Sequence, residues 1–219
     1  MLRRRLVEER AMFSDLPKAV LVFQKDYWKL MEYFANQLVD EMEGGRATER
    51  NLERRLVELF VRFFRPAKVD GVMFEVEEDE WEFVRVPSDV IKFVRQTFGS
   101  VMDFVDHVAT GIDIKLGFTA RDLAKVLVVH ELDEVKVLEP MANWLLSQVR
   151  EVERKGRRAS GAVMWHLFKR TFYKFRDEAM VDGFMFMLDG GKWVFIDSPW
   201  HFFDVIDPWK LIEYYAQSR

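Results

Sequence analysis

Apolar side chains recur at helical spacing in two segments of the chain that lie 112 residues apart. Each segment follows a hydroxyl residue suited to an N-cap, Thr48 in the first and Ser160 in the second. The spacing predicts two amphipathic helices that each bury one stripe of side chains. The stripes consist of Leu52, Leu56, Phe60 and Phe63 in the first segment and of Met164, Phe168, Phe172 and Phe175 in the second.

Each predicted helix is followed by an Asp-Gly pair and by short runs that predict a β-hairpin. The tip of the first hairpin is acidic, whereas Gly190 and Gly191 in the second suit a turn that needs positive φ. The predicted strands and turns cover residues 72–76, 77–80 and 81–85 in the first hairpin and residues 184–188, 189–192 and 193–196 in the second.

The two hairpin segments are also similar in sequence. Residues 67–87 and 179–199 are identical at nine of 21 positions without a gap, whereas chance gives about one or two. This similarity predicts an internal duplication, in which one supersecondary unit occurs twice. The identical pairs are Ala67/Ala179, Val69/Val181, Asp70/Asp182, Gly71/Gly183, Met73/Met185, Phe74/Phe186, Trp81/Trp193, Phe83/Phe195 and Pro87/Pro199.

Further helices are predicted outside these segments. Asp15 and Asp122 precede similar apolar runs and predict an Asp-capped helix at the start of each unit. The apolar spacing of residues 88–107 predicts a helix that braces the two units, with Gly99 as a break. Asp followed by Pro at positions 207–208 predicts one more helix start.

Together these elements predict a helix-rich α+β fold with two tandem units. We expect the first unit at residues 1–87, a bracing helix and connection at residues 88–117, and the second unit at residues 118–219.

The predicted order of helix, helix, capped helix and hairpin resembles the winged-helix superfamily. Residues 48–86 and 160–196 take the place of the third helix and the wing in two successive domains. The resemblance implies that such a helix enters the major groove of DNA while the wing contacts the backbone. The connections around residues 43–46 and 155–158 are irregular for this pattern, and many members of the superfamily bind only proteins.

The composition excludes several classes of protein. Apolar residues make up 49% of the chain, which is ample for packed cores. The absence of Cys excludes disulfides and Cys-ligated zinc. Without a signal-peptide pattern or an apolar run of membrane length, we expect a cytoplasmic protein that does not enter a membrane. Many charges with only three Asn and five Gln favour a thermophilic source.

The net charge of −4 conceals a basic segment. Residues 150–176 carry nine basic and two acidic side chains, so the remainder of the chain has a charge of −11. Basic and aromatic side chains alternate on the outward side of the second capped helix, and a helix N-terminus itself attracts phosphate. The sequence therefore predicts nucleic-acid contacts at Arg157, Arg158, Trp165, His166, Lys169, Arg170, Tyr173, Lys174 and Lys192.

The outward side of the first capped helix has nearly balanced charges around two valines, and its acidic hairpin tip would repel phosphate. The second hairpin is apolar on both faces, which predicts cover on both sides by the C-terminal aromatic residues or, for any surplus, by a homodimer partner. We therefore expect protein contacts at Val57, Val61, Met185 and Met187.

No catalytic motif is present. The four His residues lack metal-ligand spacing, and no Walker loop, G-x-G-x-x-G or G-x-S-x-G occurs. Asp103, Asp106 and His107 can share a helix face, but solvated surface side chains are the better interpretation. Asp70 and Asp182 suit turns better than a nuclease site. We expect no enzymatic activity, cofactor or metal.

The leading hypothesis is a DNA-binding protein, of the regulator or replication-accessory type, that contacts double-stranded DNA through the basic helix of the second unit. The first unit would be a structural partner. The main alternative is a non-catalytic scaffold or homodimer. In this alternative, the basic side of the second capped helix pairs with carboxylates of an acidic protein or of the first unit. A carboxylate-dependent enzyme is the third hypothesis.

Overall fold

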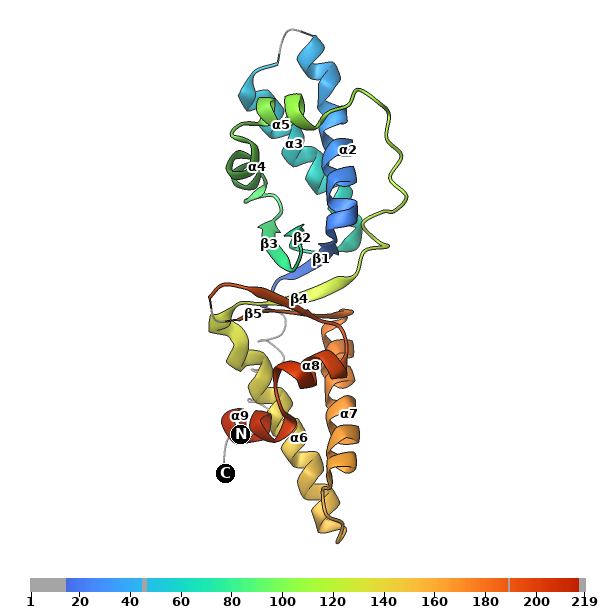
Figure 1. The fold of residues 1–219 in the computed structure, drawn as a ribbon, viewed down its shortest axis with the longest axis vertical. Coiled ribbons are helices and arrows are strands. Elements are labelled where there is room, and N and C mark those ends of the chain that lie inside the picture. The colour runs from blue at the N-terminus through green and yellow to red at the C-terminus, as the bar shows by residue number, and fades with distance from the viewer. Residues whose placement is uncertain (1–14, 45–46, 189, 217–219) are drawn as a thin grey trace. The chain divides into compact units, whose positions relative to one another are not determined.

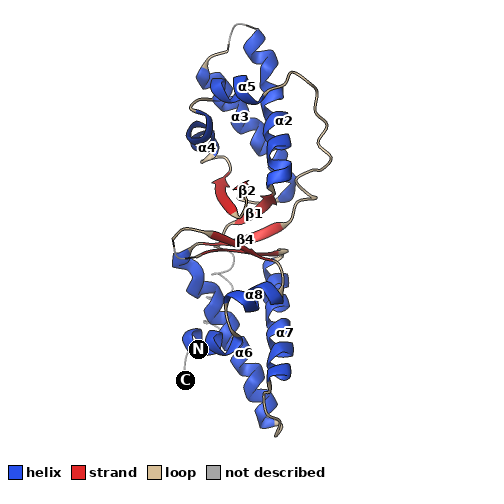
Figure 2. Cartoon of the chain, in the orientation of Figure 1, coloured by secondary structure: helices blue, strands red, loops and turns tan. Residues whose placement is uncertain are grey.

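The computed structural model describes residues 15–44, 47–188 and 190–216, and the chain forms two compact units. The first unit comprises residues 18–125, and the second comprises residues 126–216 together with residues 15–17. Each unit has its own hydrophobic core. The described part of the chain contains eight α-helices and six strands, which confirms the α+β class (Figure 2).

In the first unit, two helices connect a pair of parallel strands. Its elements are β1 (Lys18–Val22), α2 (Gln24–Glu43), α3 (Glu49–Phe64), β2 (Gly71–Glu77), β3 (Glu80–Arg85), α4 (Val90–Phe98) and α5 (Val101–Val108). Strand β1 pairs in parallel with β2, with Val20 opposite Val72, and β2 pairs antiparallel with β3. A parallel pair needs a crossover connection, which α2 and α3 provide (Figure 1).

The second unit has the same order of elements and the same strand pairing. Its elements are β4 (Lys125–Val129), which starts at the boundary, α6 (Glu134–Arg154), α7 (Gly161–Ala179), β5 (Gly183–Met187), β6 (Trp193–Ile196), α8 (Pro199–Val205) and α9 (Pro208–Tyr215). Strand β4 pairs in parallel with β5, which pairs antiparallel with β6. Descent of the two units from one ancestral unit stays a prediction.

Both capped helices form where the sequence predicts them. Seven of the eight side chains of the two stripes are buried, and Phe63 is half-buried. The Thr48 hydroxyl accepts a hydrogen bond from the Asn51 N–H at 3.4 Å, whereas Ser160 is the N-cap residue without a side-chain cap bond. Gly190 and Gly191 have φ values of 86° and 81°, as their predicted turn requires. Residues 45–46 and 189 of the predicted connections lie outside the described residues.

The helices predicted to begin at Asp15 and Asp122 are wrong, because these segments lead into strands β1 and β4. Residues 19–22 and 126–129 are 0% exposed. Apolar runs buried on both faces are typical of parallel strands. In a run this short, the spacing of apolar residues does not distinguish a strand from a buried helix. Asp122 accepts bonds from the Thr119 N–H and hydroxyl, both at 2.8 Å, which lower the pKa of its carboxyl.

Each unit therefore has the order β-α-α-β-β followed by two helices. The resemblance to winged-helix domains rests on the capped helix and the hairpin, because the first predicted helix is replaced by a strand. That resemblance stays a prediction.

Residues 88–117 do not form a separate connection. They contain α4 and α5, which pack on α2 and α3 within the first unit. Gly99 ends α4 with a φ of 96°, and Ser100 caps α5 by accepting a bond from the Asp103 N–H at 2.9 Å. The predicted break is therefore confirmed, but the observed unit boundaries are at residues 17–18 and 125–126.

Two equivalent glycines permit the close approach of the hairpin strands. A Cβ atom on Gly71 would lie 2.6 Å from the Val84 carbonyl oxygen, and one on Gly183 would lie 2.6 Å from that of Ile196. The same two positions would also collide with a phenyl ring, at 2.4 Å for Phe83 and at 2.7 Å for Phe195. Because a backbone oxygen cannot move aside as a flexible side chain does, any side chain here displaces a strand.

We predict that Gly183→Ala lowers the free energy of unfolding by about 1–3 kcal/mol, the usual cost of overpacking. Gly117→Ala is the control, because a Cβ at this position meets no atom within 4 Å. The control should leave stability unchanged or raise it slightly. Urea denaturation of both variants measures the difference, and equal stabilities would refute the steric explanation.

Candidate nucleic-acid interface

The outward side of α7 carries the side chains predicted to contact nucleic acid. The opposite side of the helix is anchored in the second core by Phe168 and Phe172, both 0% exposed. The outward residues His166, Lys169 and Arg170 are exposed, as are Arg157 and Arg158 in the turn before the helix. We call these five residues, Arg157, Arg158, His166, Lys169 and Arg170, the basic face.

The four Lys and Arg side chains of the basic face form no ion pair or side-chain hydrogen bond within the described ranges 15–44, 47–188 and 190–216. The ammonium of Lys169 lies 5.9 Å from the centre of the Tyr173 ring. The predicted cationic surface is therefore available to an anionic partner.

Two of the nearby carboxylates, Glu151 and Asp177, are engaged by other cations of the segment. Glu151 pairs with Arg154 at 2.8 Å and with Lys155 at 3.0 Å, and hydrogen bonds from Lys155 and Arg154 lower the pKa of the Glu151 carboxyl. Asp177 pairs with Arg176 at 3.2 Å. These pairs neutralise part of the basic segment without reaching the basic face.

Lys174 and Tyr173 are less available than the sequence predicts. Lys174 is half-buried, pairs with Glu178 and lies 4.7 Å from the centre of the Trp144 ring. Tyr173 is half-buried and lies beneath the Arg176 guanidinium at 4.7 Å. Both side chains therefore stabilise α7, and we place them at the edge of the basic face.

Trp165 is also partly covered, because Trp200 of α8 stacks on it. The two ring centres are 3.8 Å apart with an interplanar angle of 29°, and Phe203 meets Trp165 edge-on at 5.7 Å. Trp200 is 63% exposed and Phe203 is 40% exposed. We call Trp165, Trp200 and Phe203 the aromatic flank.

The sequence predicts Trp165 as a contact but not Trp200 or Phe203. In the sequence, the aromatic residues after Pro199 predict cover for the second hairpin, and Phe202 has this role. Phe202 is 1% exposed and lies 6.0 Å from Phe186. In α8, the ring of Phe202 points into the core, whereas the rings of Trp200 and Phe203 point outward. The helix is too short for its sequence periodicity to predict this difference.

The N-terminus of α7 and the second hairpin tip are two further positive features of the second unit. Ser160 does not cap the helix through its side chain, so the N–H groups of the first turn keep their partial positive charge. Lys192 is exposed beside the turn at Gly190 and Gly191. Each feature favours an anion, but Figure 1 shows that α7 begins at the end of the second unit away from the strands, so the two features are separate positive regions.

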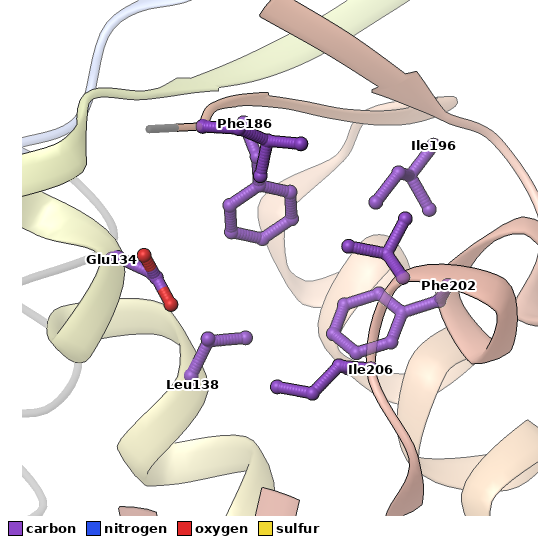
Figure 3. A pocket seen from close by; sticks show the side chains of 8 residues that line it. Glu134, Leu138, Phe186, Ile196, Phe202 and Ile206 are labelled. Carbon is purple, nitrogen blue, oxygen red and sulfur yellow. The ribbon is translucent and has the colours of Figure 1, made fainter. Parts of the chain in front are cut away.

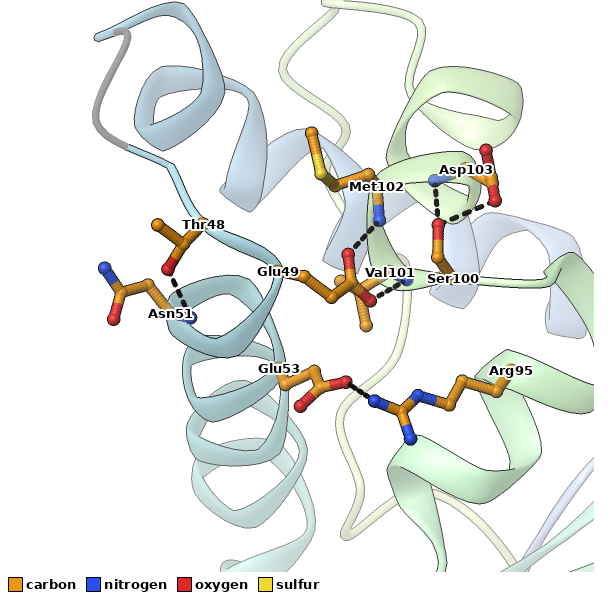
Figure 4. Close-up of polar contacts among 9 residues, drawn as sticks. All are labelled: Thr48, Glu49, Asn51, Glu53, Arg95, Ser100, Val101, Met102 and Asp103. Atoms are coloured by element: carbon orange, nitrogen blue, oxygen red, sulfur yellow. Dashed lines mark hydrogen bonds and ion pairs between the residues drawn. The ribbon is translucent and has the colours of Figure 1, made fainter.

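In the first unit, several cations are paired with carboxylates of neighbouring helices. Arg55 of α3 lies 3.1 Å from Glu41 and 3.2 Å from Glu58, and Arg95 of α4 pairs with Glu53. Glu49 accepts the N–H groups at the start of α5 (Figure 4). This unit uses its carboxylates to hold its own helices together.

The predicted protein contacts are only partly accessible. Met185 is 0% exposed, so it has no surface for another molecule, and Met187 is half-buried. Val57 and Val61 are half-buried, and Val57 packs against the first core. The burial of Met185 confirms that the second hairpin is covered on both faces.

The His residues make local contacts. His107 Nδ1 lies 2.6 Å from the carbonyl oxygen of Asp103, and His201 Nδ1 lies 2.6 Å from a carboxylate oxygen of Asp197. Across the described residues, no three acidic or His side chains are grouped so that they could hold a metal ion.

We predict different roles for two neighbouring aromatic side chains of α8. Trp200→Ala should lower the free energy of unfolding by no more than about 1.5 kcal/mol, because it removes one exposed ring pair. Phe202→Ala should lower it by about 3–5 kcal/mol, because it leaves a cavity in the core. Thermal and urea denaturation test this, and a Trp200 variant as unstable as the Phe202 variant would contradict it.

No family model matches the chain, and neither a curated protein nor a solved structure is similar to it. Among the residues that the structure describes, no helix is long and apolar enough to cross a membrane. Function is therefore inferred from the unpaired cations of the basic face, the exposed rings of the aromatic flank and the contrast with the first unit.

Proposed function

We propose that the second unit binds DNA through the basic face of α7. The observation that carries this proposal is the group of four exposed cations in the second unit that have no carboxylate partner among the described residues. The cations Arg157, Arg158, Lys169 and Arg170 are exposed and have no carboxylate partner in the described chain, whereas Arg55 and Arg95 of the first unit are paired. A cluster of unpaired like charges repels itself and is stabilised when a polyanion neutralises it.

Binding would combine charge with position. The Lys and Arg side chains neutralise backbone phosphates, and the N-terminus of α7 adds its partial positive charge. His166 lies between the cations on the outward side, where it can reach base edges if α7 enters the major groove as the winged-helix resemblance implies. Lys192 lies at the hairpin tip, away from the N-terminus of α7, and would contact the DNA backbone as the wing does in the winged-helix resemblance.

The aromatic flank extends this interface beyond the phosphates. Trp200 offers an exposed indole face beside α7, and base stacking on such rings needs unpaired nucleotides. We therefore include single-stranded as well as double-stranded DNA among the ligands to be tested.

The first unit would serve as a structural partner without DNA contacts. The tip of its hairpin carries acidic residues at positions 77–80, which repel phosphate. Two of its four α3 cations, Arg54 and Arg55, are paired with Glu58.

The second candidate is an interaction module that docks an acidic protein on the same face. The exposed rings of Trp200 and Phe203 favour this alternative, because aromatic residues are enriched in protein interfaces. A homodimer is a special case of this second candidate, in which the docked protein is another copy of the chain. The two candidates differ in the ligand, and a DNA titration separates them.

We predict that Lys169→Glu with Arg170→Glu weakens DNA binding by about tenfold or more at 0.1 M salt, because two attractive charges become repulsive. Melting temperature should stay nearly constant, since both side chains are exposed. Arg54→Glu with Arg62→Glu on α3 is the matched control and should bind as the parent does. Fluorescence anisotropy with random duplex and single-stranded DNA measures the affinities, and unchanged binding by the Lys169/Arg170 variant would reject the interface.

We further predict a steep dependence of DNA affinity on salt. Four phosphate contacts give a slope of log K against log salt of about −3 to −4 for duplex DNA. Lys169→Ala with Arg170→Ala should reduce this slope by about two, because each lost phosphate contact removes about one. A titration between low and physiological salt provides the measurement. A slope near zero in the parent protein would exclude phosphate-driven binding.

A further inference from the structure

The second unit contains a cavity of about 470 Å³, which is within the usual size range of small-molecule sites. Helix α6, strands β5 and β6, and helix α8 with the residue after it surround it (Figure 3). Seven of the eight lining side chains are apolar, and the eighth is a carboxylate. The lining residues are Glu134, Leu138, Phe186, Leu188, Ile196, Phe202, Val205 and Ile206.

The first unit shows how a unit of this fold closes the same region. Its helix α2 corresponds to α6 with a shift of 111 residues, because their buried positions then coincide. The buried pairs are Leu30 with Met141, Phe34 with Leu145, and Leu38 with Val149. With this shift, Tyr27 of α2 corresponds to Leu138 of α6.

Tyr27 is a buried ring in the first core. It is 2% exposed and meets Phe74 at 5.3 Å and Phe93 at 6.5 Å, and burial raises the pKa of its hydroxyl above the ordinary range. Strand register shows that Phe186 is the counterpart of Phe74, because Val22 lies opposite Phe74 and Val129 lies opposite Phe186.

Leu138 has no aromatic ring that could pack against Phe186. The side chain of Leu138 is buried, but it is much smaller than tyrosine, so the region that Tyr27 fills in the first unit is part of an open cavity in the second. The apolar wall of this open cavity stays in contact with water, which is unfavourable in proportion to its area. A ligand that filled the cavity would offset this cost.

The single carboxylate determines which kind of ligand fits. The Tyr215 hydroxyl donates a hydrogen bond to Glu134 Oε1, and burial together with this bond raises the pKa of Tyr215 to about 12. The second oxygen of Glu134 has no protein hydrogen bond from any described residue. Figure 3 shows the carboxylate directed toward the apolar side chains that surround the cavity.

We propose that this cavity binds a small organic ammonium ion. The apolar body of the ligand contacts Phe186 and Phe202, and its nitrogen donates a hydrogen bond to Glu134. A carboxylate beside apolar walls attracts a cation, repels an anion, and gives a neutral apolar molecule no electrostatic gain. The site is independent of the proposed DNA binding, because none of its lining residues belongs to the basic face or the aromatic flank.

The test is a calorimetric titration of the full chain, without DNA, with 2-phenylethylammonium, and in parallel with 2-phenylethanol and 3-phenylpropanoate. The ammonium ion should bind most tightly, the alcohol more weakly, and the carboxylate not at all. Absence of ammonium binding at millimolar concentration, or equal binding of the carboxylate, would overturn the proposal.

Two variants examine the charge and the space separately. Glu134→Gln should weaken ammonium binding by about tenfold and leave alcohol binding unchanged, because only a charge-assisted hydrogen bond is lost. Glu139→Gln is the matched control on the same helix and should bind as the parent does, because Glu139 does not line the cavity. Equal ammonium affinity in the parent and in Glu134→Gln would refute the assignment to a cation.

Leu138→Tyr restores the residue that the first unit has at this position. It should remove binding of both the ammonium and the alcohol while the protein stays folded, as shown by circular dichroism. Val205→Trp fills the cavity from its exposed side, since Val205 is 46% exposed, and provides the same test if the Leu138 variant does not fold. Unchanged binding in a folded variant of either kind would show that the ligand lies elsewhere.

Discussion

The parallel pairing of two strands is the constraint on which each unit depends. Parallel neighbours need a long crossover, and here a pair of helices provides it, α2 and α3 between β1 and β2, and α6 and α7 between β4 and β5. Each pair of helices buries one apolar stripe, and a hairpin strand then joins at a distance that only glycine permits, at Gly71 and Gly183. With one side of α7 held in this way, the opposite side is free to vary in charge.

The two units differ in which of their surface charges are paired. In the first unit, Glu53 and Glu49 connect α3 to α4 and α5, so its carboxylates contribute to internal cohesion (Figure 4). In the second unit, Glu151 and Asp177 engage neighbouring cations of the same segment. The remaining cations repel each other at short range, and salt screens this repulsion beyond about 10 Å. The proposed DNA ligand would relieve the repulsion.

The units also differ inside, where an aromatic ring in one corresponds to a leucine in the other. Tyr27 fills its core, whereas the cavity beside Leu138 has a carboxylate at its wall. The apolar wall of the cavity is open to water, and a ligand that covered it would remove this area from water. The basic face and the cavity use different side chains of the second unit, which allows each proposal to be tested alone.

Several elements could be predicted from the sequence because their signals are local. The two stripes, the Thr48 cap, the break at Gly99 and the turns at Gly190 and Gly191 depend on spacing and on backbone preference. Strands β1 and β4 could not be predicted from the sequence. A short apolar run fits a strand or a buried helix equally well, and the elements packed on both of its faces decide between them. The availability of Lys169 and Arg170, the stacking of Trp200 on Trp165 and the cavity beside Leu138 also required the tertiary structure. Pairing, stacking and empty space are properties of neighbours in space, and these neighbours are far apart along the chain.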